Sequence, residues 1–242
     1  MDVFDCSFGV IDLDIKPPLT DDGLILFVNW LNEMKTELRT VTIEAGNLET
    51  FEIFMNGFRK SIGFLLVNDT CYHFDHIKRL NLEVKFLFCL FGPYIHLDLL
   101  LSLDCKKIIA EGEINLTAVE LNVFLRSWQE GKTNRKLEIF QVKTDEEEDI
   151  KEVLRGCGAE IMDPRTTKLK FWDSVYGWIT LIHGGIHFRR NDGRLAVIDI
   201  NKNSTYGEVV PEENIQKYLR ERVTWNSEDF RWAERRFNIY FF

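Results

Sequence analysis

A chain of 242 residues with 45% hydrophobic residues can fill the core of one large domain or of two small ones. Its formal net charge of −9 argues against nucleic acid or an anionic membrane surface as a partner, because neither polyanion is attracted to an acidic protein. A protein or a small molecule is the expected partner.

The N-terminal stretch MDVFDCSF contains acidic residues where a signal peptide would have a basic start. The apolar run over residues 86–103 is interrupted by Gly92, Pro93, His96 and Asp98, so it does not predict a membrane span. The 5 cysteines are odd in number, which favours reduced thiols over a disulfide framework. We therefore expect an intracellular protein, cytoplasmic or nuclear, without a membrane segment.

Six short segments share one pattern, with small or large apolar residues at the first, fourth and sixth positions. In chain order they are VIDLDI (10–15), LRTVTI (38–43), IGFLLV (62–67), VKFLFC (84–89), CKKIIA (105–110) and LEIFQV (137–142). Their fourth residues stand at positions 13, 41, 65, 87, 108 and 140, and most of the intervals match the period of leucine-rich repeats. Each segment is predicted to be a strand.

Amphipathic helices are expected between these strands, because apolar residues recur there at three- and four-residue spacing behind a capping residue. Three such sets follow Thr20, Asn47 and Thr70. The best marked helix begins after Thr117, which forms a capping box with Glu120. Its apolar face is expected to pack in the core and consists of Leu121, Phe124, Leu125 and Trp128.

A second capping box, Thr144 with Glu147, predicts an acidic helix that ends near Cys157. The run from Asp145 to Asp149 would then place negative charge at the positive end of the helix dipole. Solvation of these carboxylates is a sufficient role for them.

A strand–helix unit of this length cannot bury its own apolar face and must stack on its neighbours. The pattern predicts an α/β fold over residues 1–162, a leucine-rich-repeat-like curved solenoid in which parallel strands alternate with helices. Residues 163–242 are predicted to form a small mixed α+β segment on the solenoid end. Its strands turn at residues 183–185 and 191–193, and a helix follows Pro211.

The third and fifth positions of each strand face away from the core, and in the middle of the sheet they are mostly apolar. The predicted protein-binding residues on this face are Phe64, Leu66, Phe86, Phe88, Ile109, Ile139 and Gln141. Such a patch marks either a partner site or a surface that the C-terminal segment covers. The solvent accessibility of Phe86 and Phe88 separates these two interpretations.

A zinc site would need a second ligand cluster besides Cys71, His73 and His76, and the sequence shows none at suitable spacing. We therefore predict no metal and no cofactor.

His183, His187 and Asp192 are the one cluster that resembles an acid–base site, which leaves a small hydrolase-like enzyme as an alternative. Neither a nucleophile elbow nor a phosphate-binding glycine loop accompanies them. We expect a protein without catalytic residues.

Residues 97–142 resemble the type-2 F-box-associated domain of a large nematode family. The similarity is carried by LLSLDCKKIIAEGEI (100–114) and by LTAVELNVFLRSWQEGKTNRKLEIFQV (116–142), with a leucine pair, a Cys-Lys strand, a helix that ends in a Leu-Arg-x-Trp segment and an Asn-Arg-Lys-Leu-Glu link. RRNDGRLAVI (189–198) is similar to the family's C-terminal signature, so the domain would span roughly residues 80–200.

Members of that family typically carry an F-box, which docks the Skp-type adaptor of a cullin ubiquitin ligase, while the associated domain selects the substrate. The resemblance implies a non-enzymatic protein–protein interaction module that recognises a target protein. A Leu-Pro-led F-box is not recognisable in this chain, so binding of the Skp-type adaptor is expected only if an F-box is supplied or has been missed. A competitor of F-box receptors that binds targets without delivering them is the further alternative.

Overall fold

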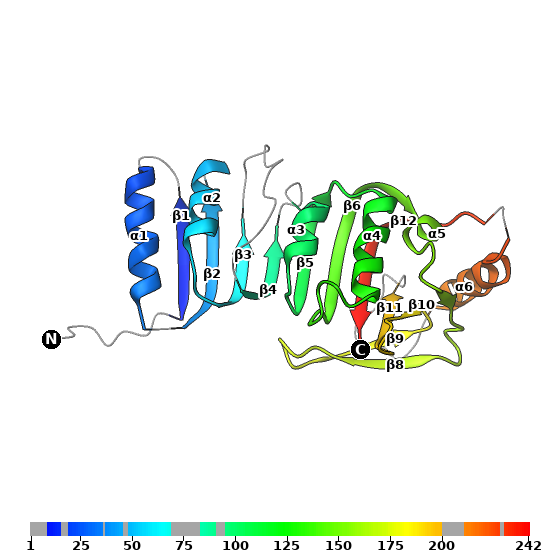
Figure 1. Cartoon of the computed structure of the whole chain (residues 1–242). Helices are drawn as coiled ribbons and strands as arrows, with labels where there is room; N and C mark the ends of the chain where they lie inside the picture. Colours follow the sequence, from blue (N-terminus) through cyan, green and yellow to red (C-terminus); the bar gives the residue numbers. More distant parts are fainter. Residues whose placement is uncertain are drawn as a thin grey trace.

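The structure, a computed structural model, describes residues 9–15, 19–35, 37–45, 48–68, 83–90, 95–199, 211–227 and 230–242. Within these residues, ten strands form one sheet in the order β1-β2-β3-β4-β5-β6-β12-β11-β10-β7, and β8 pairs with β9 separately (Figure 1). The protein is a mixed α/β fold with a large, mostly parallel sheet.

The first six strands follow one another in the sheet as they do in the chain, and every neighbouring pair is parallel. They are β1 (Val10–Ile15), β2 (Leu38–Ala45), β3 (Ile62–Val67), β4 (Val84–Cys89), β5 (Lys107–Ile114) and β6 (Ile139–Asp149). The prediction of six extended segments lying side by side is confirmed. The strong curvature expected of a solenoid is not part of the observed sheet (Figure 1).

The register agrees with the repeat alignment for five of the six strands. Directly opposite one another lie Val41, Leu65, Leu87, Ile108 and Phe140. β1 is displaced by two residues, so that Ile11 rather than Leu13 lies opposite Val41. An even displacement keeps the same side chains on the same face, because side chains alternate along a strand.

Helices cover one face of this sheet (Figure 1). They are α1 (Asp21–Glu33), α2 (Leu48–Gly57), α3 (Leu97–Ser102), α4 (Ala118–Gln129) and α5 (Ile150–Val153). The predicted capping box of α4 is present, and its whole apolar face, Trp128 included, is buried. Thr20 caps α1 as expected, by accepting a hydrogen bond from the backbone of Gly23. The short helix α3 was not predicted.

The prediction of an acidic helix after Thr144 is wrong. β6 runs through residues 145–149, and α5 is a single turn capped by Asp149. The Thr144 hydroxyl donates to the carbonyls of Glu146 and Arg235 instead of capping a helix. The Arg235 carbonyl comes from the C-terminal strand β12 (Ala233–Phe241), which pairs with β6, so a contact across about 90 residues overrides the local signal.

The C-terminal part extends the same sheet with antiparallel strands. β12 lies against β6, followed by β11 (Leu195–Asp199), β10 (Ile186–Arg189) and β7 (Glu160–Ile161). α6 (Glu212–Thr224) follows Pro211 as predicted. Because the sheet continues across residue 162, the division into 1–162 and 163–242 stays a prediction.

The predicted turn at residues 191–193 joins β10 and β11 as a hairpin. The turn at Gly184 and Gly185 instead carries the chain out of the small sheet of β8 (Lys168–Trp172) and β9 (Ile179–His183) and into the large one. Both glycines have positive φ, at 71° and 87°. A Cβ at Gly184 would lie 2.8 Å from the Met162 carbonyl oxygen, so the crossing needs glycine for space as well as for conformation.

The main core lies between the helices and the large sheet, and a second, smaller cluster lies on the opposite face under β8 and β9. Cys89, Cys105 and Cys157 are buried, and burial raises the pKa of Cys105 to about 12 and that of Cys157 to about 11. The other cysteines and the helix predicted after Thr70 lie outside the described residues. In the described part of the chain, no helix is long and apolar enough to cross a membrane.

Candidate protein-interaction site

Two rows of side chains cross the sheet face that points away from the helices. The first row runs through Phe64, Phe86, Lys107, Ile139 and Tyr240. The second row runs through Leu66, Phe88, Ile109, Gln141 and Asn238. All seven predicted binding residues therefore lie on one face in two adjacent rows, because the strands that carry them are in register.

The hairpin of β8 and β9 covers much of the first row. Phe86 is 0% exposed and Ile139 is 4% exposed. Ile139 packs with Phe171 of β8, and the ring of Tyr176, between β8 and β9, meets Phe86 edge to face at 5.8 Å between centroids. Phe86 and Ile139 are therefore packing residues. For this part of the patch the second interpretation holds: the C-terminal segment covers it.

The remaining predicted residues are partly exposed. They are Phe64, Leu66, Phe88, Ile109 and Gln141. The ring of Phe64 lies 4.6 Å from that of Phe86 and 6.3 Å from that of Phe88, measured between centroids. A buried aromatic ring thus supports two partly open ones, which fixes the positions of apolar groups that a partner can reach.

A buried ion pair fastens the hairpin to the sheet. Lys107 Nζ lies 2.6 Å from Asp173 Oδ2, and the two side chains are only 4% and 3% exposed. The Lys107 ammonium also lies 4.3 Å from the ring centroid of Tyr176 and 5.0 Å from that of Phe86. Asp173 Oδ1 accepts hydrogen bonds from the backbone N–H groups of Val175 and Tyr176, so the carboxylate organises the loop that it anchors.

These contacts set the protonation of Asp173. Burial raises the pKa of this carboxyl, but the hydrogen bonds from Lys107 and from two backbone N–H groups outweigh it, and the net pKa is below the ordinary value. Asp173 is therefore charged at neutral pH.

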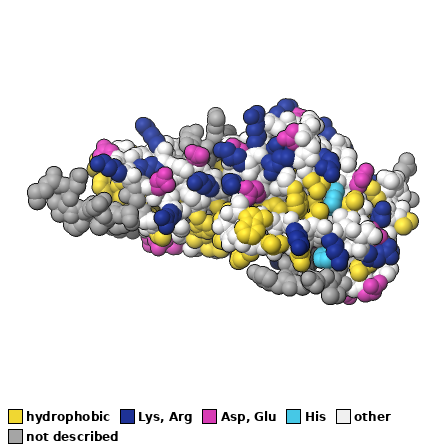
Figure 2. All heavy atoms as spheres, turned by 90° about the horizontal axis from the view of Figure 1, so that it is seen from below, with side chains coloured by type: hydrophobic (Ala, Val, Ile, Leu, Met, Phe, Trp, Pro, Cys, Tyr) yellow, Lys and Arg dark blue, Asp and Glu magenta, His cyan; other side chains and the backbone are white. Residues whose placement is uncertain are grey.

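The outer surface of the hairpin is apolar. Its members, which we call the hairpin patch, are Trp172, Val175, Tyr176, Trp178 and Ile179, each between 39% and 59% exposed. The rings of Tyr176 and Trp178 lie 4.8 Å apart. Figure 2 shows hydrophobic side chains gathered on the face where β8 and β9 lie. Exposed tryptophan and tyrosine side chains in one cluster are typical of interfaces between proteins.

The sequence prediction missed the hairpin patch. The available signal was the stretch FWDSVYGWI, residues 171–179, which holds four aromatic residues around a glycine turn. Loops lie mostly at the surface, where large aromatic side chains are unusual. Their presence at this turn would have indicated a recognition loop.

A hollow of about 380 Å³ opens at the end of the second row. Ile109, Gln141, Lys143, Arg236 and Asn238 are among its lining residues. It exists because the pairing of β5 with β6 shifts register between Ile109 and Glu113. The bulge thus places charged groups beside the apolar rows.

The three residues of the alternative enzyme site have separate surroundings. Two N–H groups of the Arg190 guanidinium donate to the Asp192 carboxylate, and the Arg194 backbone N–H does as well. His187 Nε2 hydrogen-bonds the Gly184 carbonyl, and burial lowers the pKa of His187 and of His183. An aspartate neutralised by arginine does not orient an imidazole for base catalysis.

The metal interpretation of Cys71, His73 and His76 lies outside the described residues. Among the residues that are described, His, Cys, Asp and Glu side chains do not gather in groups of three or more that could hold a metal ion.

Comparison with known proteins gives one match. Residues 73–142 match the model of the F-box associated family, which confirms the resemblance over β4, α3, β5, α4 and the start of β6. The similarity proposed for residues 143–200 lies beyond that match. No curated protein and no solved structure matches the chain.

Proposed function

Because residues 73–142 match the F-box associated family, we propose that this chain is a protein-interaction module that recognises a target protein, as the substrate-recognition part of an F-box receptor does for a cullin-type ubiquitin ligase. The observation that carries the proposal is the hairpin patch next to the second row. We call the two together the interaction face.

The interaction face has the composition of a binding site. Trp172, Tyr176 and Trp178 provide large, partly exposed rings on a loop held in place by the Lys107–Asp173 pair. Anchored aromatic residues lose little conformational entropy on binding, and truncation of such a residue typically costs an interface about 2 kcal/mol or more. The bulge hollow adds Glu111, Arg236 and Lys143, the last paired with Glu113, and these charged groups suit polar groups at the rim of a partner.

The proposed role is not enzymatic. In a ligase receptor the chemistry belongs to other subunits, so the interaction face needs only shape and apolar surface. The surroundings of Asp192 described above give no support to the hydrolase alternative. The parallel repeat units serve in this proposal as a leucine-rich-repeat-like scaffold that presents the face, in the cytoplasm or the nucleus.

Site-specific photo-crosslinking tests the proposal. A photoreactive phenylalanine analogue is placed at Trp178 or, as the control, at Trp30, an equally exposed tryptophan on α1 far from the face. We expect a target protein to be crosslinked from Trp178 and not from Trp30.

The captured target is then purified and titrated against Trp178→Ser and Trp30→Ser. Trp178→Ser should weaken binding about 30-fold, the equivalent of about 2 kcal/mol, while Trp30→Ser leaves it unchanged. Both variants should melt like the parent, because exposed substitutions change stability by about 0.5 kcal/mol or less. Equal binding by both variants would contradict the assignment of the interaction face.

Co-purification with a Skp-type adaptor separates a receptor from a competitor that does not deliver its targets. A working receptor brings down the adaptor and the target together, whereas a competitor brings down the target alone.

A further inference from the structure

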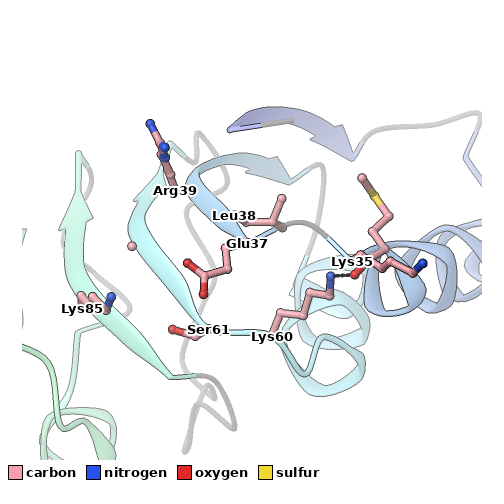
Figure 3. A pocket seen from close by; sticks show the side chains of 9 residues that line it. Lys35, Glu37, Leu38, Arg39, Lys60, Ser61 and Lys85 are labelled. Atoms are coloured by element: carbon pink, nitrogen blue, oxygen red, sulfur yellow. Dashed lines mark hydrogen bonds between the residues drawn. The ribbon is translucent and has the colours of Figure 1, made fainter. Parts of the chain in front are cut away.

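A hollow of about 430 Å³ lies where β2, β3 and β4 begin, next to the end of α1 (Figure 3). Its basic lining residues are Lys35, Arg39, Lys60 and Lys85. Glu37 is its single acidic residue, which leaves an excess of three positive charges. We call this site the basic pocket.

The pairing of the strands explains why the hollow exists. Thr40 lies opposite Phe64 and Ile62 opposite Val84, so Gly63 stands in the sheet between Arg39 of β2 and Lys85 of β4. A Cβ at Gly63 would lie 2.6 Å from the Arg39 carbonyl oxygen, so the position requires glycine. Because Gly63 has no side chain, β3 places no side chain between those of Arg39 and Lys85 on the neighbouring strands.

The cations around this space come from separate elements. Lys35 follows α1, Arg39 and Lys85 lie on β2 and β4, and Lys60 precedes β3. The Lys60 ammonium donates to the Met34 carbonyl, which holds it at the rim of the hollow (Figure 3). Arg39, Lys35 and Lys85 are exposed. Like charges at one hollow repel one another, and an anion bound between them relieves that repulsion.

The charge of the pocket is opposite to that of the whole chain, whose formal net charge is −9. A local cationic concavity in an acidic protein excludes long polyanions, which the rest of the surface repels, and admits a small, compact anion. Arginine binds a phosphate group through two parallel N–H donors and lysine binds it as a point charge, so Arg39 and Lys85 together suit this group. Ser61 adds a hydroxyl donor at the rim.

We propose that the basic pocket binds a phosphate group, held between Arg39 and Lys85 over Gly63. The group belongs either to free phosphate or to a phosphorylated side chain, and the chemistry of recognition is the same for both. The proposal does not rest on the interaction face, which lies on other residues, so either can fail without the other.

The test is titration of the full chain with inorganic phosphate at constant ionic strength, followed by calorimetry and by amide chemical shifts. We expect saturable binding, with shifts at Gly63 and at its strand neighbours. Arg39→Ala with Lys85→Ala should weaken binding at least about tenfold, since two charge-assisted contacts are lost. Arg220→Ala is the matched control, because Arg220 is an exposed arginine on α6 outside the pocket, and it should leave binding unchanged.

Glu37→Gln provides a variant that changes binding in the opposite direction. Removal of this carboxylate should strengthen phosphate binding several-fold, a result that partial unfolding cannot produce. Titration with O-phosphoserine and with serine then distinguishes the source: tighter binding of phosphoserine than of phosphate assigns a phosphorylated side chain, and the reverse assigns the free anion. Binding that Arg39→Ala, Lys85→Ala and Glu37→Gln all leave unchanged would overturn the proposal.

Discussion

Replacement of Lys107 by methionine is the sharpest test of how the hairpin is attached. The change removes the ammonium that Asp173 pairs with at 2.6 Å while it keeps the length and apolar character of the side-chain stem. Asp173 would then be a buried carboxylate with two backbone donors and no counter-ion. Loss of one partner of a buried pair costs about 3 to 5 kcal/mol. We expect about 3 kcal/mol, because the loop can lift and return Asp173 to water.

The neighbouring lysine is the matched control. Lys106 also forms an ion pair, with Glu138 at 3.0 Å, but the two side chains are 42% and 23% exposed. A surface pair of this kind contributes about 1 kcal/mol or less, so Lys106→Met should change the free energy of unfolding little.

Urea unfolding of the two variants measures the difference. The double variant Lys107→Met with Asp173→Asn should recover most of the lost stability, because no uncompensated charge remains and the amide oxygen still accepts the two backbone hydrogen bonds. If Lys107→Met costs no more than Lys106→Met, the ion pair does not hold the hairpin and the reasoning fails.

Two further predictions concern the C-terminal part. Gly184→Ala should destabilise the protein by about 2 kcal/mol or more, because the new Cβ would lie 2.8 Å from the Met162 carbonyl oxygen and the residue would keep a positive φ. Gly131→Ala is the control: its φ is 70° but the space around it is open, so it should cost only about 1 kcal/mol. Thermal unfolding of both variants measures the difference. Hydrogen bonds from Arg165 lower the pKa of Asp163 from 3.8 to about 2, so its contribution to stability is present above pH 4 and is lost as the pH falls toward 2. Asp163→Asn should flatten the dependence of the urea midpoint on pH in that interval, and an unchanged slope would exclude this carboxylate as its source.

Much of the parallel half of the sheet could be predicted from the sequence because its signals are local. Each strand carries its own apolar pattern, and the capping box of Thr117 and Glu120 lies within four residues. The repeat then supplied the order of the strands, since a right-handed strand–helix unit places each strand next to the previous one. The register of β1 was off by two residues because VIDLDI alternates evenly and fits its neighbour equally well at either position.

The rest depended on contacts between distant residues. The acidic run after Thr144 has the local pattern of a helix start, and only β12, from the far end of the chain, holds it as a strand. The burial of Phe86 depends on a hairpin whose key contact, Lys107 with Asp173, spans 66 residues. The sequence contains no local signal for the strand at residues 145–149 or for the hairpin over Phe86. The apolar rows could therefore be predicted, but not that the hairpin covers part of them.

The ion pair of Lys107 and Asp173 affects how the hairpin presents its aromatic side chains to a partner. An apolar lid over Phe86 would be about as stable, because a buried ion pair rarely exceeds a hydrophobic replacement in net stabilisation. Apolar contact is however non-directional, and it would let the loop slide over the row. The Asp173 carboxylate accepts three hydrogen bonds, one from Lys107 and two from its own loop, and this fixes which residue of the loop lies over the sheet. With that position fixed, Trp172 and Trp178 face solvent, so the ion pair that holds the hairpin over Phe86 and Ile139 also presents exposed aromatic groups beside the rest of the predicted patch.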